Sequence, residues 1–167
     1  MPETSDSFAA EFRRRLAALG IDAVLIGALA AARYRDTPRE TTDVDFLARS
    51  LQGLDDAMRR EGYSVRSVAE PGGGRPYVVF IRGPGTAVDV LLAETDYQVQ
   101  AIDRAVDGVI TAEDVIIHKL LAWRPKDLDD IAAIFAGGQP IDQEYIEGWV
   151  DAWDVRDRWE TAKRELR

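Results

Sequence analysis

The sequence predicts a mixed α+β fold, in which a mixed β-sheet of about five strands is flanked by helices and followed by a C-terminal helical extension. Two observations carry this prediction. Between residues 21 and 93, short apolar runs of strand length alternate with helical patterns and with turns rich in glycine and proline. From residue 96 onward, no convincing strand follows. We therefore expect a core over residues 1–107 and a helical region over residues 108–167 that packs on this core.

The first predicted element is an amphipathic helix over residues 7–19. Phe8, Phe12 and Leu16 recur at helical spacing, and Gly20 follows as a stop signal. The segment "IDAVLIG" then reads as a short apolar strand that ends in a glycine, from which an alanine-rich helix opens directly. The core strands are expected at residues 21–27, 43–48, 63–69, 77–83 and 87–93, with helices at 28–34 and 51–62.

The C-terminal part of the sequence predicts consecutive helices. The helix over 111–124 begins with a capping pattern, in which Thr111 caps the helix and Asp114 lies three residues on. Pro125 interrupts this helix, and the pattern resumes over 126–138. Asp142 caps a further helix, and the last helix contains Val155, Trp159, Ala162 and Leu166. We expect the C-terminal tryptophans to lie in the core or an interface.

The composition limits the classes of chemistry. The chain has 167 residues, a net charge of −9 and no cysteine, which excludes disulfides, zinc–thiolate sites and thiol nucleophiles. No signal peptide or apolar stretch of membrane-spanning length is visible, so we expect a cytoplasmic protein with no membrane partner. The acidic balance disfavours nonspecific binding to nucleic acid, and it suits a cationic small molecule, a basic partner or divalent metal ions.

Three aspartates are the candidate catalytic and metal-binding residues. Residues i and i+2 of a strand share a face, so Asp43 and Asp45 present neighbouring carboxylates while the residue between them enters the core. Asp89 is isolated in the apolar run "AVDVLLA", where an ionised carboxylate needs a partner. Three carboxylates on two adjacent strands are suited to hold two Mg²⁺ ions for in-line displacement at phosphorus.

Each of these features also has a simpler interpretation. With 30 acidic residues in the chain, two aspartates separated by one residue arise easily by chance. Asp89 then pairs with an arginine, and Gly27 marks an ordinary turn from strand to helix. Lys119, on a largely apolar helix, then extends its ammonium group to solvent. His118 is assigned no role.

Taken together, "LIGALAAARYRDTPRETTDVDFLA" and "VDVLLA" resemble the nucleotidyltransferase superfamily that shares the DNA polymerase beta fold. The shared pattern is a glycine-led turn from strand to helix, two aspartates one residue apart, and a later aspartate. The segment with Arg39, Thr41 and Asp43 is most similar to AbiEii/AbiGii-type nucleotidyltransferases. The helix segment "EDVIIHKLLAWRPKDLDDI" extends the likeness with Lys119, Arg124, Lys126 and Asp127, so it covers roughly residues 20–135.

The resemblance implies a role for each of these residues. Asp43 and Asp45 bind Mg²⁺ that bridges the triphosphate, and Asp89 completes the two-metal site and helps to activate the acceptor hydroxyl. The nucleotide-binding residues are Gly27, Ala28, Arg39, Thr41 and Lys119. Arg124 and Asp127 support the site. The superfamily usually has serine or a second glycine where this chain has Ala28, so one phosphate contact is missing.

The leading hypothesis is a Mg²⁺-dependent nucleotidyltransferase that moves an NMP from an NTP to an acceptor hydroxyl. The AbiEii-type resemblance implies a toxin of a toxin–antitoxin pair that acts on tRNA, with an antitoxin protein as partner. Three alternatives stay open. The first is a small-molecule nucleotidyltransferase of the aminoglycoside-modifying kind, the second is a nucleotide-binding module without turnover, and the third is a plain structural α/β protein.

Overall fold

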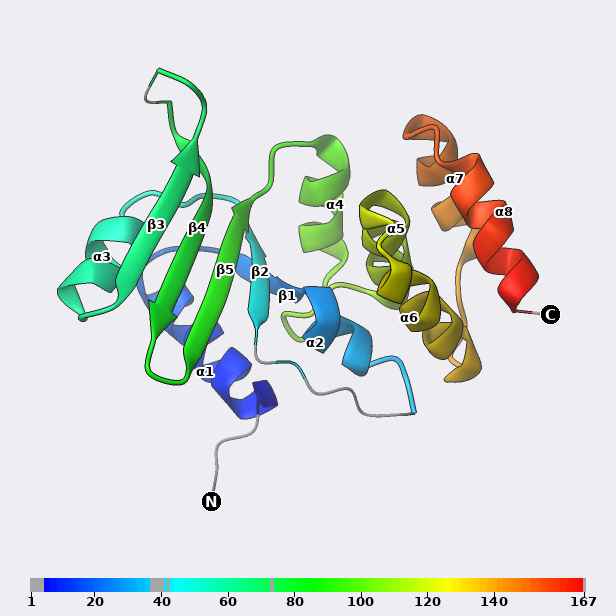
Figure 1. Cartoon of the computed structure of the whole chain (residues 1–167), viewed down its shortest axis with the longest axis horizontal. Helices are drawn as coiled ribbons and strands as arrows, with labels where there is room; N and C mark the ends of the chain where they lie inside the picture. Colours follow the sequence, from blue (N-terminus) through cyan, green and yellow to red (C-terminus); the bar gives the residue numbers. More distant parts are fainter. Residues whose placement is uncertain (1–4, 37–40, 42, 73, 167) are drawn as a thin grey trace. The chain divides into compact units, whose positions relative to one another are not determined.

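The computed structural model describes residues 5–36, 41, 43–72 and 74–166 (Figure 1). The helices are α1 (Ser5–Ala18), α2 (Gly27–Ala32), α3 (Leu54–Arg60), α4 (Asp96–Arg104), α5 (Ala112–Ala122), α6 (Pro125–Ala136), α7 (Gln143–Ala152) and α8 (Arg156–Glu165). The strands are β1 (Ala23–Ile26), β2 (Val44–Ala48), β3 (Ser64–Ala69), β4 (Pro76–Gly83) and β5 (Thr86–Leu92). None of the helices in the described ranges is long and apolar enough to span a bilayer.

The chain forms two compact units. The first consists of Met1–Leu29 and Glu40–Ile110, and the second of Ala30–Arg39 and Thr111–Arg167. All five strands of the sheet belong to the first unit, and α5 to α8 belong to the second. The division at residue 107 stays a prediction.

The sheet of the first unit is mixed, as the sequence predicts. Its strand order is β1-β2-β5-β4-β3 (Figure 1). Strands β2 and β5 are parallel, whereas the pairs β1–β2, β4–β5 and β3–β4 are antiparallel. Two strands far apart in the sequence therefore lie side by side at the centre of the sheet.

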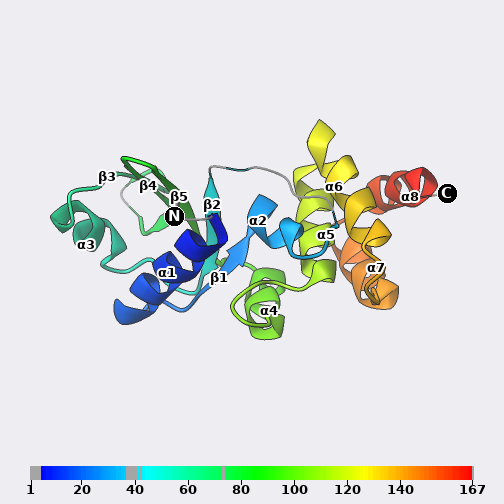
Figure 2. The same ribbon diagram turned by 90° about the horizontal axis from the view of Figure 1, so that it is seen from below.

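One face of the sheet forms the core of the first unit. Phe46 of β2 and Val90 of β5 are fully buried register partners on this face. The ring of Phe12 from α1 stacks on Phe46 with 6.1 Å between ring centroids. Helix α3 contributes the buried side chains of Leu54 and Met58, and Figure 2 shows α1 and α3 on the same side of the sheet. Because side chains alternate along a strand, the opposite face carries Asp45 and its neighbours.

The second unit is built from helices whose apolar faces meet in a small core. Ile116 of α5, Ile131 of α6, Val150 of α7 and Trp159 of α8 are fully buried. The rings of Phe135 and Trp159 lie 6.0 Å apart. This placement confirms the expectation of a core position for Trp159, whereas Trp153 is 39% exposed and does not belong to this core. The predicted caps are also present, since the side chains of Thr111 and Asp142 each accept a hydrogen bond from a backbone N–H in the first helical turn.

Helix α4 is the one element of the described chain that is not among the helices and strands predicted from the sequence. The Thr95 side chain accepts a hydrogen bond from the backbone N–H of Gln98, and the Gln98 side chain accepts one from the backbone N–H of Thr95. This reciprocal capping box satisfies backbone donors that a helix start leaves unpaired. Tyr97 and Ala101 then anchor the helix, because both are almost fully buried.

Candidate active site

Two of the predicted carboxylates are direct neighbours in the sheet. Asp45 of β2 pairs in register with Asp89 of the parallel strand β5. Register partners point to the same face, so the two side chains lie next to each other on the face opposite the core. Two adjacent carboxylates of like charge repel each other unless a cation or a proton lies between them. The pairing therefore brings together two of the three predicted carboxylates, and their role as metal ligands stays a prediction.

Asp89 has a cationic neighbour, Arg82, that is not among the site residues predicted from the sequence. Nη1 of Arg82, on β4, lies 2.6 Å from Oδ1 of Asp89. The same Nη1 donates hydrogen bonds of 3.0 Å to the backbone carbonyls of Ile81 and Val88. Oδ1 of Asp89 is buried and accepts no hydrogen bond from the described residues, so the contact with Arg82 is an ion pair without hydrogen-bond geometry. The simpler interpretation, in which Asp89 pairs with an arginine, thus describes a real contact.

Asp43 occupies a different environment from the register pair. It precedes the first residue of β2, it is exposed, and its backbone N–H donates to the side chain of Thr41 over 3.4 Å. In the part of the chain that the structure describes, no three acidic, histidine or cysteine side chains are grouped closely enough to hold a metal ion. A three-carboxylate site that includes Asp43 stays a prediction.

Gly27 fits against the carboxylate of Asp45. Its φ of 72° lies in the left-handed region, and Ile26, immediately before it, is the register partner of Asp45. A Cβ atom built on Gly27 would lie 2.2 Å from Oδ2 of Asp45. Only glycine therefore permits both the backbone conformation and this close approach. The glycine that the sequence places at the strand-to-helix turn is required by the position of the carboxylate itself.

These observations fit a divalent cation at the register pair. Two carboxylates face each other across adjacent strands, and one of their oxygens is buried without a hydrogen bond from the described residues. Carboxylate oxygens are the ligands that Mg²⁺ accepts most readily. Asp45 and Asp89 are therefore suitable ligands, and further ligands come from nucleotide phosphates and water in sites of this kind.

The Gly27→Ala variant will test the contact with Asp45. We expect it to cost about 1–2 kcal/mol of stability through its positive φ and, in addition, to displace the Asp45 carboxylate and weaken Mn²⁺ binding. Gly20→Ala is the matched control, because Gly20 has a φ of 76° and a Cβ there meets no other described atom within 4 Å. Urea unfolding and Mn²⁺ titration of both variants measure the two effects. Equal Mn²⁺ affinities in the two variants would contradict the assignment of Asp45 as a metal ligand that is positioned against Gly27.

Of the other first-motif residues predicted to bind the nucleotide, the structure places Thr41 and Ala28 but not Arg39. Arg39 lies outside the described residues. Thr41 lines a cavity of about 400 Å³ in the first unit, together with Phe8 of α1 and Thr86 of β5. Ala28 is half-buried in the first turn of α2, next to Gly27. Their roles toward a nucleotide stay predictions.

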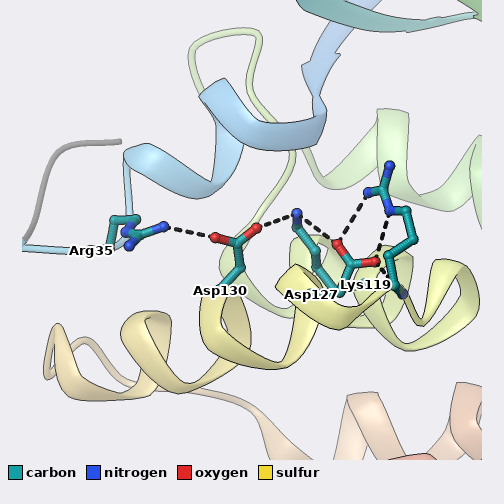
Figure 3. A network of polar contacts seen from close by, with 5 residues as sticks. Arg35, Lys119, Asp127 and Asp130 are labelled. Atoms are coloured by element: carbon teal, nitrogen blue, oxygen red, sulfur yellow. Dashed lines mark hydrogen bonds and ion pairs between the residues drawn. The ribbon is translucent and has the colours of Figure 1, made fainter. Parts of the chain in front are cut away.

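Lys119 belongs to the second unit, where it is buried rather than extended to solvent. Its Nζ lies 3.1 Å from Oδ1 of Asp127 and 2.5 Å from Oδ2 of Asp130, both on α6 (Figure 3). Asp130 also accepts a hydrogen bond of 2.7 Å from Arg35. Lys119 is only 3% exposed, and both carboxylates are equally enclosed. The interpretation of Lys119 as a lysine that reaches solvent is wrong, and its predicted contact with a triphosphate stays a prediction.

Arg124 completes this network at its other end. Its backbone N–H and its Nε donate hydrogen bonds of 2.8 and 2.9 Å to Oδ2 of Asp127. Burial raises the pKa of Asp127, but the hydrogen bonds from Arg124 and Lys119 outweigh burial and bring its pKa below the ordinary value. Asp127 therefore stays ionised, and it joins the N-terminus of α6 to the centre of α5.

His118 gives the second unit a pH-dependent stability. Burial, with a smaller contribution from the charge of Lys119, lowers the pKa of His118 from 6.5 to about 4. The unfolded chain therefore binds more protons than the folded chain between these values, so this contribution is fully present above pH 6.5 and is lost as the pH falls toward 4. His118 is the only histidine, so no other imidazole contributes.

We expect the His118→Gln variant to lose less stability than the wild type when the pH falls from 7 to 5. Glutamine cannot take up a proton, while the carboxylates that titrate in this range are common to both proteins. Urea unfolding at the two pH values measures the change. A parallel loss of stability in both proteins would contradict the lowered pKa.

Comparison with known proteins supports the fold. No protein-family model matches this sequence, and no curated protein matches it. The solution structure of the antibiotic-resistance factor ANT(2'')-Ia is similar with a TM-score of 0.60 and 16% sequence identity, over 97% of this chain and 98% of that chain. This likeness confirms the predicted mixed sheet flanked by helices as a nucleotidyltransferase fold.

Two further solved structures are more distant. An antigenic nucleotidyltransferase-like protein from Paracoccidioides brasiliensis has a TM-score of 0.49 and 18% identity, over 96% of this chain and 95% of that one. A tRNA-processing enzyme in its apo form has a TM-score of 0.42 and 17% identity, over 70% of this chain. The matched part is 27% of that enzyme's length.

Proposed function

We propose that this chain is a metal-dependent nucleotidyltransferase, which moves an NMP from an NTP to a hydroxyl group of an acceptor. The observation that carries the proposal is the register pair Asp45–Asp89, enclosed on one side by Gly27. A pair of adjacent carboxylates on a sheet face is suited to divalent metal ions, and a nucleotidyltransferase fold is a context in which such ions serve phosphorus chemistry. The resemblance of the aspartate motifs and the likeness in fold support the same assignment.

In this proposal Asp45 and Asp89 hold Mg²⁺, and Asp43 adds a ligand from the residue before β2. When bound, the metal would neutralise the negative charge that develops on the triphosphate during transfer. Gly27 and Ala28 approach the phosphates with their backbone N–H groups, as the sequence motif suggests. Arg39, Thr41 and Lys119 are the proposed further contacts of the nucleotide.

The proposed reaction is a single displacement at phosphorus. The acceptor oxygen forms a bond to the α-phosphorus, and the bond from this phosphorus to the oxygen that bridges to the β-phosphate breaks. Pyrophosphate leaves with the electron pair of that bond. Asp89 takes the proton of the acceptor hydroxyl and returns it to solvent.

The first candidate acceptor is tRNA, as the AbiEii-type motifs imply, and in that case an antitoxin protein is the expected partner. A small-molecule acceptor of the aminoglycoside kind is the second candidate. Two observations favour it, because this chain matches ANT(2'')-Ia over nearly the full length of both chains and because a net charge of −9 attracts cationic molecules.

The experiment is transfer of label from each α-labelled NTP in the presence of Mg²⁺. Total RNA and a set of aminoglycosides are offered as acceptors in separate reactions. Label in RNA supports the first acceptor, and label in an aminoglycoside supports the second. If calorimetry shows that an NTP binds but no label is transferred, the chain is a nucleotide-binding module without turnover. The phosphate contact that is missing at Ala28 agrees with that outcome. The absence of both label transfer and NTP binding would contradict the proposal as a whole.

A further inference from the structure

Arg82 lies where a metal ion bound to Asp89 would compete with it. Its Nη1 is 2.6 Å from Oδ1 of Asp89, and this oxygen is buried without a hydrogen bond from the described residues. A divalent ion and a guanidinium group cannot both occupy this approach to one oxygen, because like charges at contact distance repel strongly. The oxygen is therefore available either to Arg82 or to a metal ion.

The backbone contacts of Arg82 explain how the side chain is held there. Its Nη1 donates to the carbonyls of Ile81 and Val88, each over 3.0 Å, so the guanidinium is positioned by the sheet and not by Asp89 alone. The Arg82 side chain is 44% exposed, compared with 21% for Asp89. Solvent on its open side gives Arg82 room to turn away, whereas Asp89 is fixed in the central strand.

A second arginine on the same face provides a comparison. Arg66 of β3 lies in register with Phe80 of β4, which in turn lies in register with Asp89. The guanidinium of Arg66 lies 4.1 Å above the Phe80 ring, and that of Arg82 lies 5.6 Å from it. Arg66 is exposed and pairs with no carboxylate among the described residues. It therefore contributes the same charge to this face without contact with Asp89.

We propose that Arg82 is a positioning residue that serves as the counter-cation of Asp89 while the site holds no metal, and that metal binding displaces it. This inference rests on the proposed function, because it takes Asp45 and Asp89 as metal ligands. In the resting site Arg82 offsets the repulsion between the two carboxylates and holds Asp89 in place. When a divalent ion binds, the guanidinium turns toward solvent on the open face of the sheet.

The contact between Arg82 and Asp89 affects a free metal ion and a metal–nucleotide complex differently. A metal ion that arrives alone must displace a cation from its ligand, which weakens its binding. A metal ion that arrives with a triphosphate brings negative charge with it, and the displaced Arg82 then gains anionic oxygens as partners. The site accordingly favours the metal–nucleotide complex over the free ion.

Mn²⁺ titration of the full chain tests the proposal, with free Mn²⁺ followed by electron paramagnetic resonance. Arg82→Gln should bind Mn²⁺ about threefold to tenfold more tightly than the wild type, which is the range expected when one competing, partly exposed ion pair is removed. Arg82→Lys keeps the charge and should stay close to the wild type. Arg66→Gln is the matched control and should stay within about twofold.

Unfolding in EDTA and in saturating Mn²⁺ provides a second readout. Without metal, Arg82→Gln should unfold at a lower temperature than Arg66→Gln, because Asp89 loses its partner. In saturating Mn²⁺ this difference should disappear, because Arg82 no longer contacts Asp89 once the metal is bound and the tighter Mn²⁺ binding of Arg82→Gln offsets its lost stability. A change that merely damaged the sheet would lower both the melting temperature and the Mn²⁺ affinity.

Three outcomes would overturn the proposal. Unchanged or weaker Mn²⁺ binding in Arg82→Gln, with normal binding in the wild type, would contradict the role of Arg82 and leave the proposed metal site intact. An equal increase in Arg66→Gln would show that only the general charge of the face matters. Failure of every protein, including the wild type with a bound NTP, to bind Mn²⁺ would contradict both the inference and the proposed function.

Discussion

Replacement of Asp45 or Asp89 with asparagine will lower the rate of nucleotidyl transfer by about a thousandfold, because a metal site at phosphorus contributes several kcal/mol to transition-state stabilisation. Each change removes one negative charge and keeps the size of the side chain. The two side chains are register partners, so each variant removes one half of the same pair. Steady-state transfer from an α-labelled NTP to the identified acceptor is the measurement.

The control for this prediction is Asp56→Asn. Asp56 is an exposed carboxylate on α3, in the same unit of the chain, and α3 lies against the opposite face of the sheet. We expect this variant to transfer within about twofold of the wild type, since surface substitutions away from a site have small effects. Wild-type rates in Asp45→Asn and Asp89→Asn would remove the carboxylate pair from the mechanism.

The Lys119→Met variant will lose about 3–5 kcal/mol of unfolding free energy, the usual effect of removing one partner from a buried ion pair. The change leaves Asp127 and Asp130 enclosed without the ammonium group that lies between them. Arg124 and Arg35 still donate to these carboxylates, but neither replaces the lost donor. Urea unfolding measures the loss.

The matched control is Lys126→Met, which removes the same charge from an exposed position on α6 and should change the unfolding free energy by no more than about 0.5 kcal/mol. The double variant Lys119→Met/Asp130→Asn should recover part of the lost stability, because it removes one of the two buried negative charges that Lys119 offsets. Equal stability of the two lysine variants would show that the network contributes little. Loss of NTP binding in a folded Lys119→Met protein would favour the predicted triphosphate contact.

Much of the first unit is predictable because its signals are local. Apolar runs of strand length, and turns such as Pro84-Gly85, identify each strand to within a few residues. The period of two along a strand places Asp45 on the face away from Phe46. The caps at Thr111 and Asp142 are also local patterns. The pattern of Thr95 and Gln98 before α4 has the same form, so the sequence did contain a signal for this helix.

The contacts that define the site are not local, and this is why they were only partly predicted. Parallel pairing of β2 and β5 joins residues about forty positions apart in the chain, and the sequence alone fixes neither the partner nor the register. The position of Arg82 beside Asp89 depends on the antiparallel pairing of β4 with β5. Burial of Lys119 depends on how α6 packs on α5, whereas the sequence of α5 alone is compatible with a lysine that reaches solvent.

The most direct test of the central claim is the position of Mn²⁺ in a crystal of the full chain grown with a nonhydrolysable NTP analogue. Anomalous scattering locates the ion independently of the protein density. We predict a Mn²⁺ peak within bonding distance of carboxylate oxygens of both Asp45 and Asp89, with the phosphates of the analogue on its other side. A bound nucleotide whose Mn²⁺ contacts neither aspartate would contradict the assignment of this pair as the metal site.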